Sequence, residues 1–304
     1  MIGDLLKQLA IALPRYVWYR AKKAVGAPIP NTPPVPPPAG ERFDTLTNTI
    51  GLDPKYQANV SWPTQRNDAL PEYLLSDPLY KLWSTTSGGQ KFSHYYSVYR
   101  KVFDPLRTLP LRVLEIGVLE GSSLKLWKKY FAHERTEIVG IDIDPNCSRY
   151  DAPSDGIHVR IGSQDDPAFL KMVVSELGPF DLIIDDGSHQ SSHIIGTFNH
   201  LFAEGLKDSG IYFVEDLHAS YWPGWRDSRN SFIDVCKELV ELMNAHYRGL
   251  SPFAILVDTP SAQPMESLQV PIVTTMIQEI RFFDSIVAIY KAKLDTVPFI
   301  VRNS

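Results

Sequence analysis

From residue 111 onward, short apolar runs alternate with longer segments whose apolar residues have helical spacing. This alternation predicts right-handed βαβ units, which build a parallel sheet with helices on both faces. Each run is apolar almost throughout, as expected of a strand whose two faces are both buried. We therefore predict an α/β fold with a Rossmann-like, doubly wound, mostly parallel sheet. The expected strands are 111–118, 138–144, 157–162, 180–186 and 210–216, and the expected helices between them are 122–131, 167–177 and 192–202.

The C-terminal part of the sequence predicts further elements of the same sheet domain. A helix is expected at 230–245 and a strand at 252–258. The run 279–293 has two β-rich halves that meet at Asp284 and Ser285. We expect a closing pair of strands there, joined by a bulge or a tight turn, so that the sheet ends in an antiparallel C-terminal strand.

Three segments precede this domain, which we place at 109–304. The first, 1–26, is predicted to be an amphipathic N-terminal helix with basic residues toward its end. It either packs on its own domain or on a partner subunit of a homo-oligomer, which we prefer, or contacts an anionic membrane surface through residues 1–25. The segment 27–40 contains seven prolines, which favour a semi-rigid polyproline linker or, alternatively, a docking site for a proline-reading partner. Residues 41–108 are expected to form a helical cap with loops.

Composition disfavours two classes of protein. The formal net charge of −5 implies no strongly basic surface, so nucleic acid is not an expected partner. The two cysteines, Cys147 and Cys236, are too few for a disulfide scaffold and lack the spacing of a metal site. We therefore expect a cytoplasmic protein, associated with the cytoplasmic membrane face only if the N-terminal helix binds lipid.

The residues just after each strand are the candidate site, because open parallel sheets bind ligands beyond the carboxyl ends of their strands. After the first strand, Gly117 and Gly121 permit a tight turn and a close approach of the backbone to a ligand. Glu115 and Glu120 flank that turn, where they would repel a phosphate and attract a cation.

The next two strand ends suit a nucleoside. Asp142 stands where a carboxylate commonly binds ribose hydroxyls, and Ser163 and Gln164 can hydrogen-bond an adenine edge. Tyr95 begins an expected helix beside a glycine loop that could cover a ligand. S-adenosylmethionine, an adenosine-bearing cation with an amino-acid tail, suits all three loops. The predicted cofactor-binding residues are Tyr95, Glu115, Gly117, Gly121, Ser122, Asp142, Ser163, Gln164 and Asp185.

Several motifs resemble those of a known family. "VLEIGVLEGSS" followed by "VGIDID" resembles the first two motifs of class I S-adenosylmethionine-dependent methyltransferases. "LIIDDGSH", "GIYFVEDLHASYW" and "IRFFDSIVAIYK" resemble a narrower group, the metal-dependent sugar O-methyltransferases of the macrocin and mycinamicin type. The resemblance covers roughly residues 84 to 294.

Carboxylates end two strands that are expected to be neighbours. Asp185 and Asp186 end one strand, and Glu215 and Asp216 end the next. Carboxylates gathered at one place repel one another unless a cation lies among them, and oxygen ligands without cysteine favour Mg²⁺, Ca²⁺ or Mn²⁺. The resemblance implies that Asp186, Glu215 and Asp216 bind Mg²⁺ and that His189 is the general base. An imidazole suits that role because its pKa lies near neutrality.

Four further side chains are assigned with alternatives left open. Asp185 either caps the following turn or holds a backbone amide there, which we prefer, or binds a ligand. His218, Tyr221 and Trp222 follow the fifth strand, where they either contact the substrate or pack within the protein. We prefer substrate contact, because aromatic rings stack on sugar faces.

The expected function is transfer of a methyl group from S-adenosylmethionine to a hydroxyl of a sugar, with Mg²⁺ as metal cofactor. The partner is then a sugar-containing small molecule or a glycan, including glycolipids and polysaccharides. One alternative is an O-methyltransferase of a catechol or other non-sugar diol, and another is a relative of the proteins labelled cephalosporin hydroxylase. A binding-only module is disfavoured because it has no need of a base at His189.

Overall fold

The computed structural model describes residues 70–222, 224–249 and 269–294. The predicted N-terminal helix 1–26, the proline-rich segment 27–40 and the predicted strand 252–258 lie outside the described residues. The chain divides into two compact units, one made of Met1–Ser76 with Trp222–Gly224 and the other of Asp77–Tyr221 with Trp225–Ser304.

The described part of the first unit includes one short helix, α4 (Glu72–Leu75), with Leu74 buried. The second unit contains the sheet. Residues from Asp77 to 108, which belong to the predicted cap, lie in that same compact unit.

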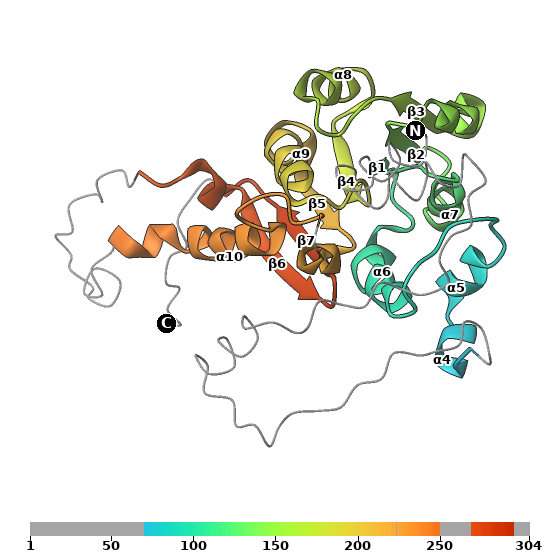
Figure 1. The fold of residues 1–304 in the computed structure, drawn as a ribbon, viewed down its shortest axis with the longest axis horizontal. Coiled ribbons are helices and arrows are strands. Elements are labelled where there is room, and N and C mark those ends of the chain that lie inside the picture. The colour runs from blue at the N-terminus through green and yellow to red at the C-terminus, as the bar shows by residue number, and fades with distance from the viewer. Residues whose placement is uncertain (1–69, 223, 250–268, 295–304) are drawn as a thin grey trace, which may run out of the picture. The chain divides into compact units, whose positions relative to one another are not determined.

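The second unit has a seven-stranded sheet with the strand order β3-β2-β1-β4-β5-β7-β6 (Figure 1). β1 to β5 pair in parallel, β7 is antiparallel to β5, and β6 is antiparallel to β7. This confirms the predicted mostly parallel sheet with an antiparallel C-terminal end. The strands are β1 (Arg112–Ile116), β2 (Glu137–Asp142), β3 (Ile157–Ile161), β4 (Phe180–Asp185), β5 (Leu206–Val214), β6 (Ile277–Phe283) and β7 (Ile286–Lys291).

The helices between the strands are also those that the sequence predicts. Two begin at strong caps: Asp166 accepts backbone hydrogen bonds ahead of a proline at the start of α8, and Ser231 forms a capping box with Asp234 in α10. The α-helices of this unit are α5 (Pro78–Trp83), α6 (Tyr95–Phe103), α7 (Ser122–Tyr130), α8 (Pro167–Leu177), α9 (Ser191–Glu204) and α10 (Phe232–Met243). Short 3-10 helices are η2 (Asp104–Leu106), η3 (Pro145–Tyr150), η4 (Pro153–Asp155), η5 (Leu217–Tyr221), η6 (Ala245–Gly249) and η7 (Ile272–Thr275).

Helices cover both faces of the sheet. Neighbouring residues of β5 point to opposite faces, and each packs against a different set of helices. Tyr212 packs edge-on against Phe198 of α9, with ring centroids 5.2 Å apart. Phe213 packs on Phe103 of α6 at 4.8 Å, and Phe103 in turn contacts Trp127 of α7 at 5.5 Å. Buried residues of α8, α9 and α10 join the Tyr212 side of the core, opposite α6 and α7 (Figure 1).

The register of the sheet brings three strand ends to one level. Asp185 of β4 pairs with Ile116 of β1 on one side and with Val214 of β5 on the other. The residues that follow each of these therefore lie side by side. The antiparallel β7 adds the β6–β7 turn to the same edge, where the carbonyl of Ser285 accepts a 3.0 Å hydrogen bond from the amide of Leu217.

No helix in the described ranges is long and apolar enough to cross a membrane.

Candidate active site

One group of metal-ligating side chains lies at the ends of β4 and β5. Asp186, His189 and Asp216 each offer one ligand atom, and these atoms all lie within 4.8 Å of one another. Two of the predicted metal ligands and the predicted base are therefore brought together. We call the loops after β4 and β5, together with the β6–β7 turn, the metal half of the site.

Glu215, the third predicted metal ligand, is not in that group and lies deeper. Its side chain is fully buried. Oε2 accepts hydrogen bonds from Lys91 Nζ at 2.6 Å and from the Tyr99 hydroxyl at 2.7 Å. Oε1 is buried without a hydrogen-bond partner in the part of the chain that the structure describes. Burial raises the pKa of Glu215 to about 8, although the charge of Lys91 acts to lower it.

Lys91 is a member of the site that sequence reasoning missed. Its ammonium bridges two strand ends, 2.5 Å from Asp186 Oδ2 and 2.6 Å from Glu215 Oε2. Burial acts to lower the pKa of Lys91, but Asp186 and Glu215 outweigh it, so this pKa lies well above its usual value. The sequence predicts a cation among these carboxylates but indicates only a metal ion, whereas the structure places the ammonium of Lys91 there.

The hydroxyl of Tyr95, a predicted cofactor-binding residue, is bound to a carboxylate of the metal half. Its ring is fully buried, and its hydroxyl donates to Asp216 Oδ1 at 2.6 Å and lies 3.0 Å from Ser285 Oγ. The structure therefore uses Tyr95 to hold a carboxylate, because the start of α6 packs against the end of β5. The other oxygen of Asp216, Oδ2, lies 3.7 Å from His189 Nε2. Burial acts to raise the pKa of Asp216, but the charges of His189 and Lys91 lower it below its usual value.

The β6–β7 turn contacts His218 through Ser285. Ser285 Oγ lies 2.6 Å from His218 Nδ1 and accepts a 3.1 Å hydrogen bond from the His218 amide. The imidazole also packs edge-on against Phe92, with ring centroids 5.0 Å apart. Burial lowers the pKa of His218. The predicted tight turn at Asp284 and Ser285 is confirmed, and it places Ser285 in the site, which the sequence did not indicate.

Three non-glycine residues of the metal half have left-handed backbone conformations. The φ angles are +59° for His189, +54° for Asp216 and +64° for Ser285. Such angles are uncommon outside glycine and are concentrated where a structure over-determines the geometry of a functional site. They indicate that the packing around this edge fixes the directions of the side chains.

The loops after β1, β2 and β3 form the second part of the site, which we call the nucleoside half. Asp142 accepts backbone hydrogen bonds from Val118 and Leu119, both at 2.9 Å to Oδ2, and from Asp144 at 2.8 Å to Oδ1. Its carboxylate thus ties the turn after β1 to the end of β2. Gly117 adopts φ +98°, and a Cβ there would overlap the carbonyl of Asp186.

The start of α7 and the strand beneath it complete this turn. Gly121 adopts φ +67° against the ring of Tyr150, and Ser122, the first residue of α7, is largely buried. Glu115 is fully buried within β1, and its Oε1 accepts a 3.0 Å hydrogen bond from the indole of Trp127. Burial raises the pKa of Glu115 to about 7.

The predicted adenine loop is held by its own side chains. Gln164 accepts a 2.7 Å hydrogen bond from the Ser188 amide and donates to Asp185 Oδ1 at 3.3 Å. Asp185 is buried and also accepts from the amide of Gly187, as the alternative reading of this residue expected. Ser163 Oγ accepts from the Asp165 amide at 3.2 Å, so Ser163 stays near the end of β3.

The two predicted substrate aromatics are both accessible. Tyr221 ends η5, and its side chain is 53% exposed. Trp222 is 38% exposed and belongs to the first compact unit.

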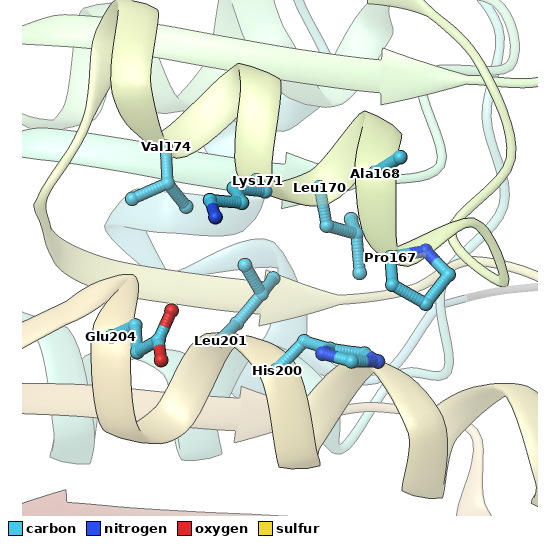
Figure 2. Close-up of a pocket in the computed structure, with 8 residues that line it drawn as sticks. All are labelled: Pro167, Ala168, Leu170, Lys171, Val174, His200, Leu201 and Glu204. Atoms are coloured by element: carbon cyan, nitrogen blue, oxygen red, sulfur yellow. The ribbon is translucent and has the colours of Figure 1, made fainter.

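A separate groove of about 340 Å³ lies between α8 and α9 (Figure 2). Its walls are mainly apolar, with Lys171, His200 and Glu204 among them (Figure 2). It contains none of the predicted site residues and offers no converging ligand set, so it is not the candidate active site.

The metal half suits a hard divalent cation. Its ligands are carboxylate oxygens and one imidazole, while both cysteines are buried elsewhere. The side chains of Asp186 and Asp216 are 20% and 27% exposed, so an ion can reach them from solvent. Among the described residues, no donor binds Oε1 of Glu215, which is buried. Mg²⁺, Ca²⁺ and Mn²⁺ prefer such oxygen donors.

Comparison with known proteins agrees with this geometry, although no family model matches the chain. The chain is 38% identical over 165 residues to an 8-demethyl-8-alpha-L-rhamnosyl tetracenomycin-C 2'-O-methyltransferase of Streptomyces olivaceus, covering 50% of this chain and 42% of that protein. It is 36% identical over 144 residues to a mycinamicin VI 2''-O-methyltransferase of Micromonospora griseorubida, covering 44% of this chain and 34% of that protein. The matches therefore span less than half the length of these curated relatives.

A solved structure has a similar fold. The MycE methyltransferase of the mycinamycin biosynthetic pathway, in complex with Mg, SAH and mycinamycin VI, aligns with a TM-score of 0.56 and 26% sequence identity. The alignment covers 73% of this chain and 56% of that chain. Together with the curated relatives, it confirms the predicted resemblance to sugar O-methyltransferases.

Proposed function

We propose that this chain is an S-adenosylmethionine-dependent O-methyltransferase that acts on a hydroxyl of a sugar. The observation that carries the proposal is the group Asp186, His189 and Asp216, which joins a base to two hard-oxygen ligands at the carboxyl edge of the sheet. The names of the relatives support the substrate class, because they denote methyltransferases of rhamnosyl and macrolide compounds. They favour a sugar over a catechol.

Asp186 and Asp216 would hold Mg²⁺, with Glu215 Oε1 as the deeper ligand. S-adenosylmethionine supplies an electrophilic methyl group, and Mg²⁺ lowers the pKa of a hydroxyl and orients it. The chain's own contribution is to fix three carboxylates at adjacent strand ends, two of them partly exposed and one buried. Positioning of the reactants accounts for much of the rate, since a sulfonium needs little further activation.

His189 would accept the proton of the acceptor hydroxyl. Its Nε2 lies 3.7 Å from Asp216 Oδ2, which orients the ring and stabilises the imidazolium once it has taken the proton. The imidazole nitrogen lies within 4.8 Å of carboxylate oxygens of Asp186 and Asp216, which supports this role.

The nucleoside half would bind the methyl donor. Gly117 and Gly121 leave the backbone of the turn after β1 open to close approach by a ligand. Asp142 and Gln164 act chiefly by holding their loops, since Asp142 accepts from backbone amides and Gln164 binds the Ser188 amide and two side-chain oxygens. His218 and Tyr221 are the proposed contacts to the sugar. Membrane contact through the N-terminal helix and homo-oligomer formation stay predictions for residues outside the described ranges.

The test is transfer of radiolabelled methyl from S-adenosylmethionine to a panel of rhamnosyl and deoxyhexosyl glycosides, with a catechol as the non-sugar diol. We expect transfer to a glycoside that EDTA abolishes and Mg²⁺ restores. His189→Ala should lower kcat by about 10²–10⁴-fold, as expected for loss of a general base. His200→Ala, in the groove between α8 and α9, should behave as wild type.

Two results would redirect the proposal. Transfer to the catechol without transfer to any glycoside would favour the non-sugar diol alternative. An unchanged kcat in His189→Ala would remove this residue from the proton-transfer step.

A further inference from the structure

We propose that Lys91, Tyr95 and Tyr99 form a positioning row that presets the three carboxylates of the metal half for a divalent cation. The inference rests on the proposed function, because it concerns the same carboxylates. It goes beyond that function by assigning a role to three residues that do not themselves contact the cation.

The three donors bind all three carboxylates, and Glu215 accepts from two of them. Lys91 donates to Asp186 Oδ2 and to Glu215 Oε2, Tyr95 donates to Asp216 Oδ1, and Tyr99 donates to Glu215 Oε2. Tyr95 and Tyr99 are four residues apart on one face of α6, and Lys91 lies in the segment ahead of that helix. The helix face therefore reaches the end of β5, and Lys91 connects it to the end of β4.

The row binds one oxygen of each carboxylate and not the other, and the second oxygen of Asp216 lies 3.7 Å from His189 Nε2. In the described part of the chain, the hydrogen bonds to Asp186 use Oδ2 and those to Asp216 use Oδ1. Glu215 shows the same division most clearly, with Oε2 held twice and Oε1 buried without a partner. A carboxylate fixed by one oxygen presents the other in a defined direction, which is what a monodentate metal ligand requires. Hydrogen bonds behind metal ligands commonly have this orienting role.

Lys91 adds charge to this arrangement. Its ammonium separates Asp186 from Glu215, so the two strand ends do not face each other as unpaired anions. A tethered ammonium could also compete with a metal ion for the same oxygens. The two roles predict opposite changes in metal affinity when Lys91 is removed, which makes them separable by experiment.

The tyrosine hydroxyls can be removed without disturbing the core. Tyr99 packs against Phe103, Trp127 and Phe213, and phenylalanine would keep these contacts. Tyr130 offers a matched control, because it is also buried and donates to a carboxylate, that of Asp104, away from the site. Tyr130→Phe therefore loses a similar hydrogen bond without touching the metal half.

The experiment is Mn²⁺ binding to the full chain, titrated by electron paramagnetic resonance in the absence of methyl donor and acceptor. Tyr95→Phe and Tyr99→Phe should each raise the Mn²⁺ Kd by about tenfold or more, within the range for residues that orient metal ligands. Lys91→Met should raise it as well, and Lys91→Arg should lie closer to wild type than Lys91→Met does. Tyr130→Phe should leave the Kd unchanged.

The outcomes separate this inference from the proposed function. If the wild type binds no Mn²⁺, the metal-dependent function and the positioning row both fail. If it binds Mn²⁺ and the tyrosine variants bind it equally well, only the positioning row is overturned. Tighter binding by Lys91→Met would make Lys91 a competitor of the ion and remove it from the row. Should Lys91→Met fail to fold, the two tyrosine variants still decide the proposal.

Discussion

The two halves of the site use similar polar side chains in different ways. In the nucleoside half, Asp142 binds three backbone amides through both oxygens, and Gln164 is occupied at both ends of its amide. In the metal half, Asp186 and Glu215 are each held through one oxygen. In the nucleoside half these side chains therefore stabilise the conformation of the loops. In the metal half they present oxygens to a ligand. A buried carboxylate is not by its presence alone a ligand, as Asp142 shows. Glu115 in the nucleoside half resembles Glu215 in one respect, because its Oε2 is buried without a hydrogen-bond partner among the described residues.

The strongest test of this difference is Asp186→Asn. Loss of a metal ligand should lower methyl transfer by about 10³-fold, since a bound metal contributes several kcal/mol to stabilising the transition state. Binding of S-adenosylhomocysteine, measured by calorimetry without metal, should stay near the wild-type value because Asp186 belongs to the metal half. A parallel loss of nucleoside binding would mean that the two halves are not separable.

Glu115 gives the nucleoside half a dependence on pH. Its pKa is raised by burial to about 7, whereas an unfolded glutamate titrates near 4.3. Between these values the folded state keeps a proton that the unfolded state releases, so the free energy of unfolding falls as pH rises. Glu115→Gln should remove this pH-dependent change in the free energy of unfolding, which amounts to about 2–3 kcal/mol between pH 5 and pH 8.

Urea unfolding of the wild type and of Glu115→Gln at pH 5 and pH 8, with EDTA present, measures that difference. The variant should gain stability relative to the wild type at the higher pH. Parallel pH profiles of the two proteins would show that Glu115 does not keep its proton in the fold.

Gly117→Ala tests the point where the halves touch. The new Cβ would overlap the Asp186 carbonyl, and the backbone there has φ +98°, which disfavours alanine. We expect a loss of about 2 kcal/mol in the free energy of unfolding, as for other overpacked sites, with weaker binding of both Mn²⁺ and nucleoside. Gly196→Ala is the control, because its Cβ would meet only Asp165 Oδ1 at 3.9 Å. Equal stability of the two variants would argue against the close approach.

Asp142→Asn should have the smallest effect. An asparagine cannot accept from all three amides, because its NH₂ group would face at least one of them. We expect roughly a tenfold loss in affinity for S-adenosylhomocysteine, the cost of one unsatisfied buried amide, with Mn²⁺ affinity unchanged. A change in Mn²⁺ affinity of the same size would place Asp142 in both halves.

The strands and helices of the described residues, and the convergence of Asp186, His189 and Asp216, could be predicted from the sequence. Apolar runs mark buried strands, and the βαβ rule then brings their carboxyl ends together. The partners of those carboxylates could not be predicted in the same way. The direction in which α6 presents Tyr95, and the path that brings Lys91 beneath Asp186, depend on how the helix packs against the sheet.

Ser285 shows a related limit. The sequence indicated a tight turn there, but its part in the site depends on the strand order, which puts β7 next to β5. The antiparallel pairing then brings the turn beside Leu217 and His218. Strand order beyond the regular βαβ units is set by long-range packing, which leaves little local signal in a single sequence.

The hydrogen bonds from the segment ahead of α6 to the ends of β4 and β5 constrain how this chain can be recombined with its relatives. Lys91 and its partners are 95 and 124 residues apart in the chain, so a crossover between them joins donors from one parent to acceptors from another. Chimeras made to exchange acceptor preference should therefore have their N-terminal junction before Ser84, so that Lys91, Tyr95 and Tyr99 come from the same parent as Asp186 and Glu215. A junction between α6 and β4 would succeed only where both parents carry a matching row.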